Sequence, residues 1–509
     1  NGSVTFNDSG LNSYADSFEI NLDDATAGTI SFAGTTAFTG SASLSALTTR
    51  NITVPGNVSV RTVDGDITLS ANMQATTTAG SFSGITVANA VVESTGGGRV
   101  SLLGTGGATS ASVGVALTNG SRVIGGDRVG TSLTIEGVGG TGDGLNRGVL
   151  VSTGGTAVSS LGGNVTIIGS GGAPESSEYN TGVVVTGSST ITAGESGSVA
   201  IQGTGGHSPG NHQRGVTVDD SGVITSSGGD VSVTGQGGGE ADSAWNVGVL
   251  LSGGGKITSG SNGTVTVTGT GGSSGGNKNF GIFVTNAGST ITSGGGDISI
   301  TGQGGGTGAS GTNLGVQVDA DGQIAGTGAG TVTVNGIGGA TSGDLNHGVN
   351  LTSDVISSDG NISITGQGGG IGGSTANIGI VVGATVISQG TGSVVVNGTG
   401  GAVDGVNNHG VAVDGTDSRI ASSAGNVTVI GQGGGTGTSS NNLGVKITNA
   451  GTVTAGGMGV VSVAGTGGNS EGDWNDGVKI SSEATITTGG GNVFVTGQGG
   501  GSRESEANV

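Results

Sequence analysis

The sequence predicts an all-β chain that winds as a right-handed parallel β-solenoid, with about 33 residues and three short strands in each coil. Three observations predict this fold. Short runs in which Val or Ile alternates with Ser or Thr recur at that period, glycine turns separate the runs, and an Asn-x-Gly triplet precedes one run in nearly every period. Right-handedness follows the general rule for crossover connections between parallel strands.

Composition narrows the classes of protein to which the chain can belong. Glycine makes up 121 of 509 residues and proline only 3, without the strict triplet period of collagen. Aromatic residues are 2%, so a core must be built from Val, Ile and Leu. The net charge of −21 argues against a nucleic-acid partner, because phosphate binding needs many Lys and Arg residues. The sequence has no run of about 18 apolar residues, so we expect no membrane insertion.

The repeats divide the chain at residue 65. Residues 1–65 hold strand-like runs at uneven spacing and are predicted to form irregular N-terminal coils or a cap, since terminal repeats usually deviate. Residues 66–509 are predicted to form regular β-solenoid repeats with an incomplete final coil. Because Asn508 and Val509 stop where the consensus continues, we expect open strand edges, and with them end-to-end self-association or neighbouring chains of a fibre.

Each regular coil is expected to contain three strands whose side chains alternate between the interior and the solvent. In the first strand Val231 and Val233 point inward and Ser232 points outward. The second strand repeats Gly-Val-x-Val, as at Val216, and the third contributes one inward isoleucine, such as Ile257. One coil buries too few side chains to fold alone, so the coils should be stable only as a stack.

The Asn-x-Gly triplet predicts a column of amides along one inner corner. An amide donates and accepts at once, so in-register coils would let each member bond the one above and the one below. Gln213 keeps this chemistry, and Ser112 precedes the column with a hydroxyl. The glycine of the triplet indicates a positive φ or a close backbone approach. The predicted structural ladder is Asn146, Asn180, Gln213, Asn246, Asn279, Asn313, Asn346, Asn377, Asn408, Asn442, Asn475 and Asn508.

A two-coil super-repeat lies on top of the single-coil period. Coils that read GQGGG after the first strand alternate with coils that carry only two glycines there. The residue between Asn and Gly alternates as well, from apolar in one class (Val247, Leu314) to mixed in the other (Arg214, His347). Duplication of a two-coil unit explains this pattern, and an alternating lateral contact surface is the other interpretation.

No set of residues predicts catalysis, a cofactor site or a metal site. His207 and His212 share one loop with Arg214, but no third metal ligand accompanies them. Asp219 and Asp319 occupy equivalent positions three coils apart, about 14 Å at strand spacing, which exceeds the separation used in glycoside hydrolysis. The chain is therefore predicted not to be an enzyme.

Two weaker interpretations stay open. Acidic turns such as Asp219–Asp220 leave weak calcium binding open, although the nonapeptide calcium repeat is absent. The outward Ser and Thr residues of the first strand, such as Thr266 and Thr268, form a hydroxyl array of the kind that binds ice or glycans. Residues such as Ile168 interrupt that array, and exposed Thr also simply suits a strand.

The repeats resemble those of a known class of bacterial surface proteins. The segments GNVTVIGQGGG (Gly425–Gly435) and GDITLSANM (Gly65–Met73) are similar to repeats of filamentous haemagglutinin-like adhesins and autotransporter passengers. The resemblance covers about residues 66–509 and is one of composition and repeat style. It implies an extracellular or cell-surface stalk, fibre or adhesive surface.

These observations predict a structural or adhesive segment of an extracellular surface fibre, stalk or filament. Its partners would be copies or neighbours in the fibre, and surface glycans or other cells. The alternatives are a carbohydrate-active β-helix enzyme, either a lyase or a hydrolase, with its site in residues 1–98, and an ice-binding or glycan-binding surface array.

Overall fold

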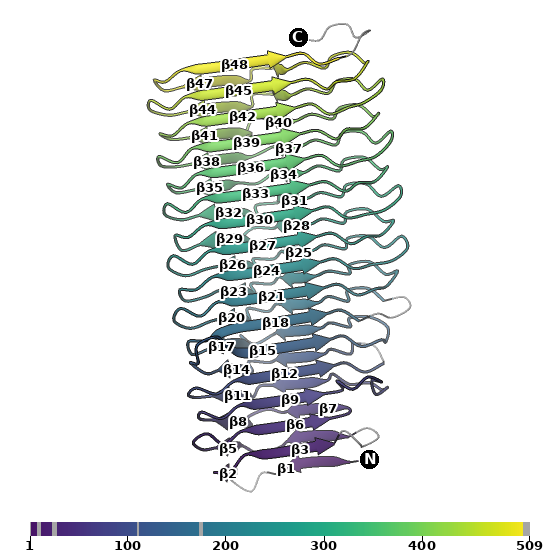
Figure 1. Cartoon of the computed structure of the whole chain (residues 1–509), viewed down its shortest axis with the longest axis vertical. Helices are drawn as coiled ribbons and strands as arrows, with labels where there is room; N and C mark the ends of the chain where they lie inside the picture. Colours follow the sequence, from purple (N-terminus) through teal and green to yellow (C-terminus); the bar gives the residue numbers. More distant parts are fainter. Residues whose placement is uncertain (1, 8–11, 23–27, 109–110, 173–176, 502–509) are drawn as a thin grey trace. The chain divides into compact units, whose positions relative to one another are not determined.

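The computed structural model describes residues 2–7, 12–22, 28–108, 111–172 and 177–501. Within these residues the regular structure consists entirely of β-strands, and every third strand belongs to the same parallel sheet (Figure 1). We name the sheets by their first members: sheet 1 starts with β1, sheet 2 with β2 and sheet 3 with β3. The predicted first strand of a coil lies in sheet 3, the second strand lies in sheet 1 and the third strand lies in sheet 2.

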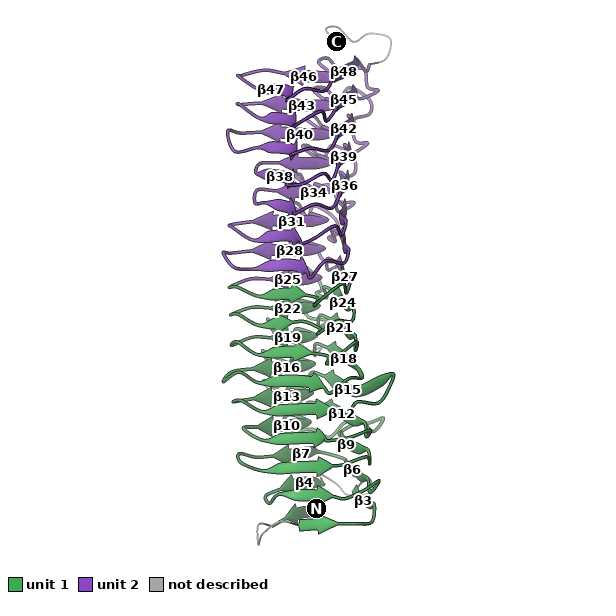
Figure 2. Ribbon diagram, turned by 90° about the vertical axis from the view of Figure 1, so that its left-hand side faces the viewer, with its two compact units in different colours: residues 1–240, 253–263 green, residues 241–252, 264–509 purple. Residues whose placement is uncertain are grey.

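The chain divides into two compact units, which Figure 2 distinguishes by colour. Unit 1 comprises residues 1–240 and 253–263, and unit 2 comprises residues 241–252 and 264–509. Each unit is an all-β solenoid with three parallel sheets, so the predicted fold class is confirmed within each.

Unit 1 contains the following strands. In sheet 1 they are β1 (Ser3–Phe6), β4 (Thr29–Phe32), β7 (Asn51–Val54), β10 (Ile85–Ala88), β13 (Val115–Thr118), β16 (Val149–Ser152), β19 (Val183–Val185) and β22 (Val216–Val218). In sheet 2 they are β2 (Asn12–Tyr14), β5 (Thr36–Phe38), β8 (Ser59–Thr62), β11 (Val91–Ser94), β14 (Arg122–Gly125), β17 (Ala157–Ser160), β20 (Thr190–Thr192), β23 (Val223–Ile224) and β26 (Lys256–Thr258). In sheet 3 they are β3 (Phe18–Leu22), β6 (Leu44–Thr48), β9 (Ile67–Ala71), β12 (Val100–Thr105), β15 (Thr131–Val138), β18 (Asn164–Ser170), β21 (Val199–Thr204) and β24 (Val231–Gln236).

Unit 2 repeats the arrangement. In sheet 1 its strands are β25 (Val249–Leu251), β28 (Ile282–Thr285), β31 (Val316–Asp319), β34 (Val349–Leu351), β37 (Ile380–Val382), β40 (Val411–Asp414), β43 (Val445–Thr448) and β46 (Val478–Ile480). In sheet 2 they are β29 (Thr290–Ser293), β32 (Gln323–Gly326), β35 (Val355–Ser357), β38 (Thr385–Ser388), β41 (Arg419–Ser422), β44 (Thr452–Ala455) and β47 (Thr485–Thr488). In sheet 3 they are β27 (Val265–Thr270), β30 (Ile298–Gln303), β33 (Val332–Ile337), β36 (Ile362–Gln367), β39 (Val394–Thr399), β42 (Val427–Gln432), β45 (Val461–Thr466) and β48 (Val493–Gln498).

The early strands pair in the same three sheets as the later ones of unit 1, but their coils are shorter. Ser3 pairs with Thr29, and Thr29 pairs with Asn51, which gives smaller steps than the regular period. Leu44 of β6 pairs with Ile67 of β9, so strand pairing continues across residue 65. Irregular spacing in the sequence therefore reflects shorter connections between strands of one solenoid.

The interior is built from the predicted alternation of side chains. Val231 and Val233 are fully buried, whereas Ser232 between them is half-buried. The parallel register places similar side chains of successive coils next to one another, as where Val199 pairs with Val231 in sheet 3. This stacking gives each unit a continuous aliphatic core.

Candidate functional site

The recurring Asn-x-Gly triplets place their amides in the interior, at the corner where the chain enters sheet 1. The residue before each amide adopts a positive φ, for example 63° at Leu345 and 58° at Trp474. The glycine after it is required by close backbone approach, since a Cβ on Gly281 would lie 2.4 Å from the Gln303 nitrogen. The fully buried members are Asn146, Asn180, Gln213, Asn246, Asn279, Asn313, Asn346, Asn377, Asn408, Asn442 and Asn475, and Asn508 lies outside the described residues.

Hydrogen bonds join these amides from coil to coil within each unit. In unit 2, Asn346 donates to Asn377 Oδ1 from its backbone nitrogen at 3.1 Å and from Nδ2 at 3.3 Å. Asn377 in turn donates to Asn408 Oδ1 from Nδ2 at 3.1 Å. In unit 1, Asn180 Nδ2 donates to Gln213 Oε1 at 2.9 Å, so the longer amide takes the same place. We call these residues the amide column.

In unit 2, the two-coil alternation is visible in how each amide uses its second N–H. In coils of the GQGGG class the amide donates to a serine three residues earlier, as from Asn377 Nδ2 to Ser374 Oγ at 2.9 Å. In the other class it donates to a glycine carbonyl at the same spacing, as from Asn346 Nδ2 to Gly343 O at 2.6 Å. The same alternation recurs at the pairs Asn313–Ser310, Asn442–Ser439, Asn279–Gly276, Asn408–Gly405 and Asn475–Gly472.

The third glycine of GQGGG makes room for this serine–amide pair. Gly370 has a φ of +88°, and a Cβ there would lie 2.7 Å from Asn377 Nδ2 and 2.9 Å from Ser374 Oγ. Gly306 stands in the same relation to Asn313 and Ser310. The super-repeat therefore corresponds to two ways of completing one hydrogen-bonding site.

A second layer of side chains covers the outward face of sheet 1, and sequence analysis missed it. The residue between Asn and Gly packs there together with the outward residue of the strand. In unit 2 Val247, Leu250, Phe280 and Leu314 form a buried apolar cluster in this layer. The available signal was the apolar character of Leu250 and of Phe283 at positions that strand alternation assigns to solvent.

Two histidines in this layer accept hydrogen bonds from the next coil. Ile378 N donates to His347 Nδ1, and Leu443 N donates to His409 Nδ1, each at 3.2 Å. Burial lowers the pKa of His347 to about 4, and burial with Lys446 nearby lowers the pKa of His409 to about 3. Both rings are therefore neutral at pH 7, as an accepting Nδ1 requires.

Two hollows open onto the outer face of sheet 1. The first, in unit 2, has a volume of about 290 Å³, and we call it the aromatic hollow. Asn350 Nδ2 donates to Gln317 Oε1 at 2.8 Å, and Gln317 Nε2 donates to Asp319 Oδ2 at 3.2 Å. It is lined by Trp245, Lys278, Phe280, Phe283, Thr312, Leu314, Gln317, Asp319, Leu345, His347 and Asn350.

The second hollow, in unit 1, has a volume of about 310 Å³ and is lined by Arg147, Arg214, Tyr179 and Asp219 among others. Burial lowers the pKa of both guanidinium groups, and the Asp219 charge partly offsets the shift. His212 stacks on Tyr179 with 4.5 Å between ring centroids, and its Nδ1 lies 2.9 Å from Arg214 Nη2.

The structure does not bring together the two histidines that share a loop in the sequence. His207 Nδ1 lies 3.6 Å from Glu240 Oε1, whereas His212 lies against Tyr179 and Arg214. Within the described residues, no group of three or more His, Cys, Asp or Glu side chains could hold a metal ion.

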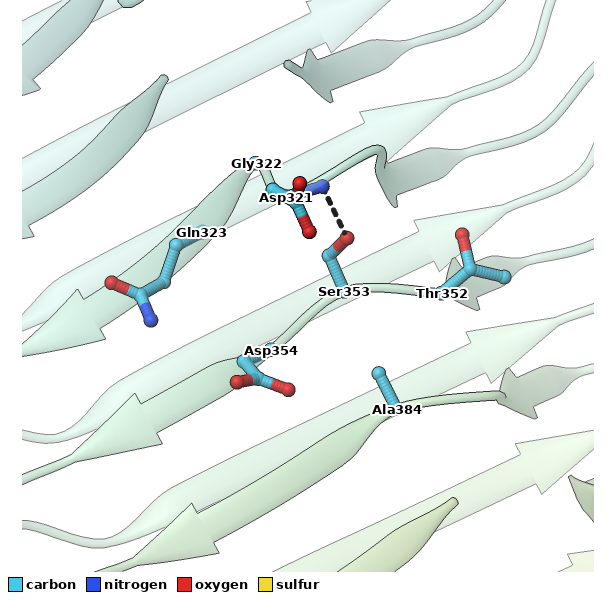
Figure 3. Close-up of a pocket in the computed structure, with 7 residues that line it drawn as sticks. All are labelled: Asp321, Gly322, Gln323, Thr352, Ser353, Asp354 and Ala384. Carbon is cyan, nitrogen blue, oxygen red and sulfur yellow. Dashed lines mark hydrogen bonds between the residues drawn. The ribbon is translucent and has the colours of Figure 1, made fainter. Parts of the chain in front are cut away.

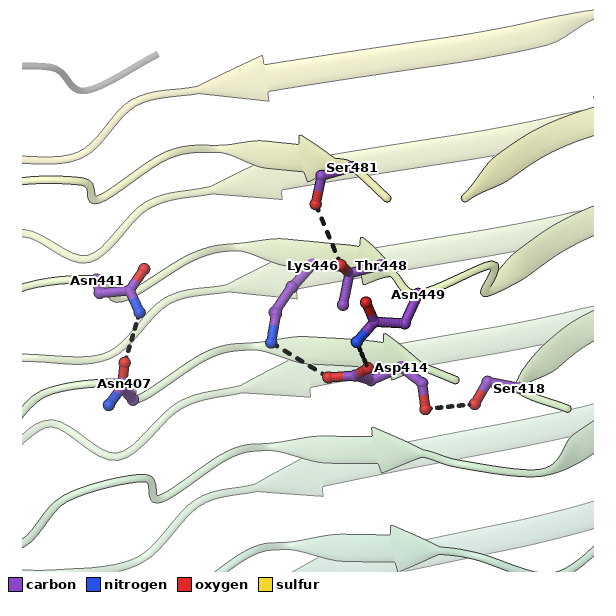
Figure 4. A network of polar contacts seen from close by, with 8 residues as sticks. All are labelled: Asn407, Asp414, Ser418, Asn441, Lys446, Thr448, Asn449 and Ser481. Carbon is purple, nitrogen blue, oxygen red and sulfur yellow. Dashed lines mark hydrogen bonds and ion pairs between the residues drawn. The ribbon is translucent and has the colours of Figure 1, made fainter. Parts of the chain in front are cut away.

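The equivalent aspartates differ in how their carboxylates are satisfied. Asp414 accepts from Lys446 Nζ at 3.3 Å and from Asn449 Nδ2 at 2.7 Å (Figure 4). Asp219 and Asp319 each keep a buried Oδ1 that has no hydrogen-bond partner in the described structure. The protein therefore supplies donors to both carboxylate oxygens at Asp414, and leaves one carboxylate oxygen unpaired at Asp219 and at Asp319.

Acidic turns also line a hollow of about 280 Å³ at the entry to sheet 2. Figure 3 shows Asp321 and Asp354 there, with Asp321 N donating to Ser353 Oγ at 3.0 Å. Asp354 Oδ1 is already used as an acceptor by Thr385 N at 3.0 Å. Calcium binding at such turns stays a prediction.

No known protein-family model matches the chain, and no curated protein matches it significantly. The part of the chain that the structure describes contains no helix long and apolar enough to cross a membrane. The chain is a β-solenoid repeat protein.

Proposed function

We propose that the chain is a structural and adhesive segment of an extracellular surface fibre. The observation that carries this proposal is the amide column, because the residues repeated most strictly in the sequence are buried and bonded to neighbouring coils. Repetition of this kind serves stacking, since each coil completes the hydrogen bonds of the next. The net charge of −21, which favours solubility, and the resemblance to surface adhesins and autotransporter passengers also support the proposal.

Fibre neighbours are the partners that the proposal implies. They are copies of the chain or neighbouring chains of a fibre, together with surface glycans or other cells.

Surface labelling tests the proposed location. Antibodies raised against unit 2 should bind intact, unpermeabilised cells of the producing organism, as measured by flow cytometry. Antibodies against a cytoplasmic protein of the same cells provide the control for leakage. Binding that appears only after permeabilisation would contradict an extracellular role.

The rival class, a carbohydrate-active enzyme, is tested separately. Purified full-length chain is incubated with a panel of neutral and acidic polysaccharides, and low-mass products are measured by mass spectrometry. A structural and adhesive segment should release none above the level of a buffer control. Product release that co-purifies with the chain would replace the structural proposal with an enzymatic one.

A further inference from the structure

We propose that the aromatic hollow binds a sugar ring of a neutral glycan. This inference rests on the adhesive part of the proposed function and names the ligand class for it. It concerns the outer face of β28, β31 and β34 in unit 2, where strand alternation alone would place only solvated side chains.

The hollow gathers three aromatic rings in a chain that holds few of them. The whole sequence holds 2 Trp, 2 Tyr and 8 Phe residues, and three of these meet here. Trp245 and Phe280 have ring centroids 5.9 Å apart, and Phe280 and Phe283 have centroids 5.1 Å apart. Phe280 is buried beneath half-buried Trp245 and Phe283, so the rings form a supported wall. The C–H face of a pyranose packs on such a wall.

Next to Phe283 on sheet 1, the hollow offers a short chain of planar polar groups. This chain runs from Asn350 through Gln317 to Asp319 by the two hydrogen bonds described above. Both ends of it are acceptors without partners, since Asn350 Oδ1 and Asp319 Oδ1 are buried and unbonded in the described structure. A buried acceptor left unpaired is costly, so these atoms favour a ligand that brings hydroxyl donors.

The solenoid supplies an internal comparison for this argument. Lys446 and Asn350 occupy equivalent positions. Lys446 pairs with the residue two before Asp414, and Asn350 pairs with the residue two before Asp319. Lys446 and Asn449 donate to Asp414 and satisfy it. Asn350 instead donates to Gln317, and Asp319 Oδ1 stays buried beside the hollow without a hydrogen-bond partner in the described structure.

Charge and size narrow the ligand class. Lys278 Nζ lies 4.4 Å from the Trp245 ring centroid, so one cation at the hollow offsets the single carboxylate of Asp319. The hollow therefore favours a neutral ligand over an acidic one. Its volume of about 290 Å³ is at the small end of the range for ligand sites, which suits one or two sugar rings.

The test uses tryptophan emission from the full chain. Trp245 and Trp474 are the only tryptophans, so Trp474→Phe leaves Trp245 as the sole reporter. The probes are hexasaccharides of β-1,4-glucose, β-1,4-N-acetylglucosamine, α-1,4-glucose, β-1,4-galactose and α-1,6-mannose. At least one probe should change the emission saturably. In the same background, Phe283→Ala and Asn350→Ala should each weaken that binding tenfold or more.

Asp414→Asn is the matched control, because protein donors already satisfy the Asp414 carboxylate. This variant should bind the saccharide with unchanged affinity. Melting curves of all variants identify any that fail to fold, and the two hollow variants provide independent tests. The inference is overturned if no probe gives a saturable change, or if both folded hollow variants bind as the parent does. Positive surface labelling with no saccharide binding would reject this inference alone, whereas failed labelling would reject the proposed function.

Discussion

At the residue scale, the recurring polar side chains are explained by hydrogen bonds inside the solenoid. Asn377 illustrates this, since its Oδ1 accepts from Asn346 and its Nδ2 donates to Asn408 and Ser374. The sequence predicted that these amides would lie in register, because the triplet recurs at the coil period. It could not show how each second N–H is used, since that depends on a loop serine or carbonyl folding back beneath the amide.

Removal of one amide should destabilise unit 2. Asn377→Leu removes the Oδ1 acceptor of the Asn346 backbone nitrogen and Nδ2 in a buried site, at a cost of about 1–3 kcal/mol for each unsatisfied group. Urea unfolding followed by circular dichroism measures the loss. Asn377→Gln is the matched control, because Gln213 fills this position in unit 1, and it should lose less. Equal stability of the Leu variant and the parent would contradict a structural role.

The buried histidines should make stability fall as the pH is lowered. The folded pKa is about 4 for His347 and about 3 for His409, against about 6.5 in the unfolded chain. Below pH 6.5 the unfolded state therefore binds more protons than the folded state, and the unfolding free energy drops by up to about 1.4 kcal/mol per pH unit for each histidine.

Urea midpoints between pH 7.5 and pH 5 check this slope, in a window where most carboxylates remain charged. The double variant His347→Leu, His409→Leu should flatten it, because Leu occupies the same position at Leu314 and Leu443. A slope that persists in the double variant would assign the pH dependence to other groups.

At the scale of the element, strand alternation predicts the buried face of sheet 3 but not the side chains that cover sheet 1. Alternation of Val and Ser correctly predicts which face of sheet 3 is buried, as at Val231 and Ser232. The same rule assigns Leu250 and Phe283 to solvent, but the corner residues turn back over sheet 1, burying Leu250 and half-burying Phe283. That layer is formed by loops whose path the strand period does not encode, so the aromatic hollow could not be predicted from the sequence.

The third glycine of GQGGG should be required for its turn. Gly370→Ala forces a side chain into a positive-φ position, with its Cβ against Asn377 and Ser374, and should cost about 1–3 kcal/mol. Gly373→Ala, in the same loop, meets no atom within 4 Å and should be close to neutral. Thermal unfolding of the two variants compares them directly. Equal melting temperatures would mean that the serine–amide pair does not require a glycine at position 370.

At the scale of the whole molecule, both units use one construction. Each has three parallel sheets, an aliphatic interior and an amide column, so the function proposed for the chain is that of a scaffold with a ligand site on its side. The fold could be predicted because one short pattern is repeated many times and each copy reinforces the assignment. The function could not be predicted to the same depth, since the hollow depends on which side chains stand at repeated positions in a few coils, and the repeat does not fix those side chains.

The central claim is that the amide column is buried structure and not a solvent-facing ligand stripe. Hydrogen–deuterium exchange of the side-chain amides of asparagine tests it most directly, with selective ¹⁵N labelling and detection by nuclear magnetic resonance. The account predicts that the amides of the column, such as those of Asn346 and Asn377, stay protected while that of exposed Asn277 exchanges at once. Exchange of the column amides at the rate of Asn277 would contradict it.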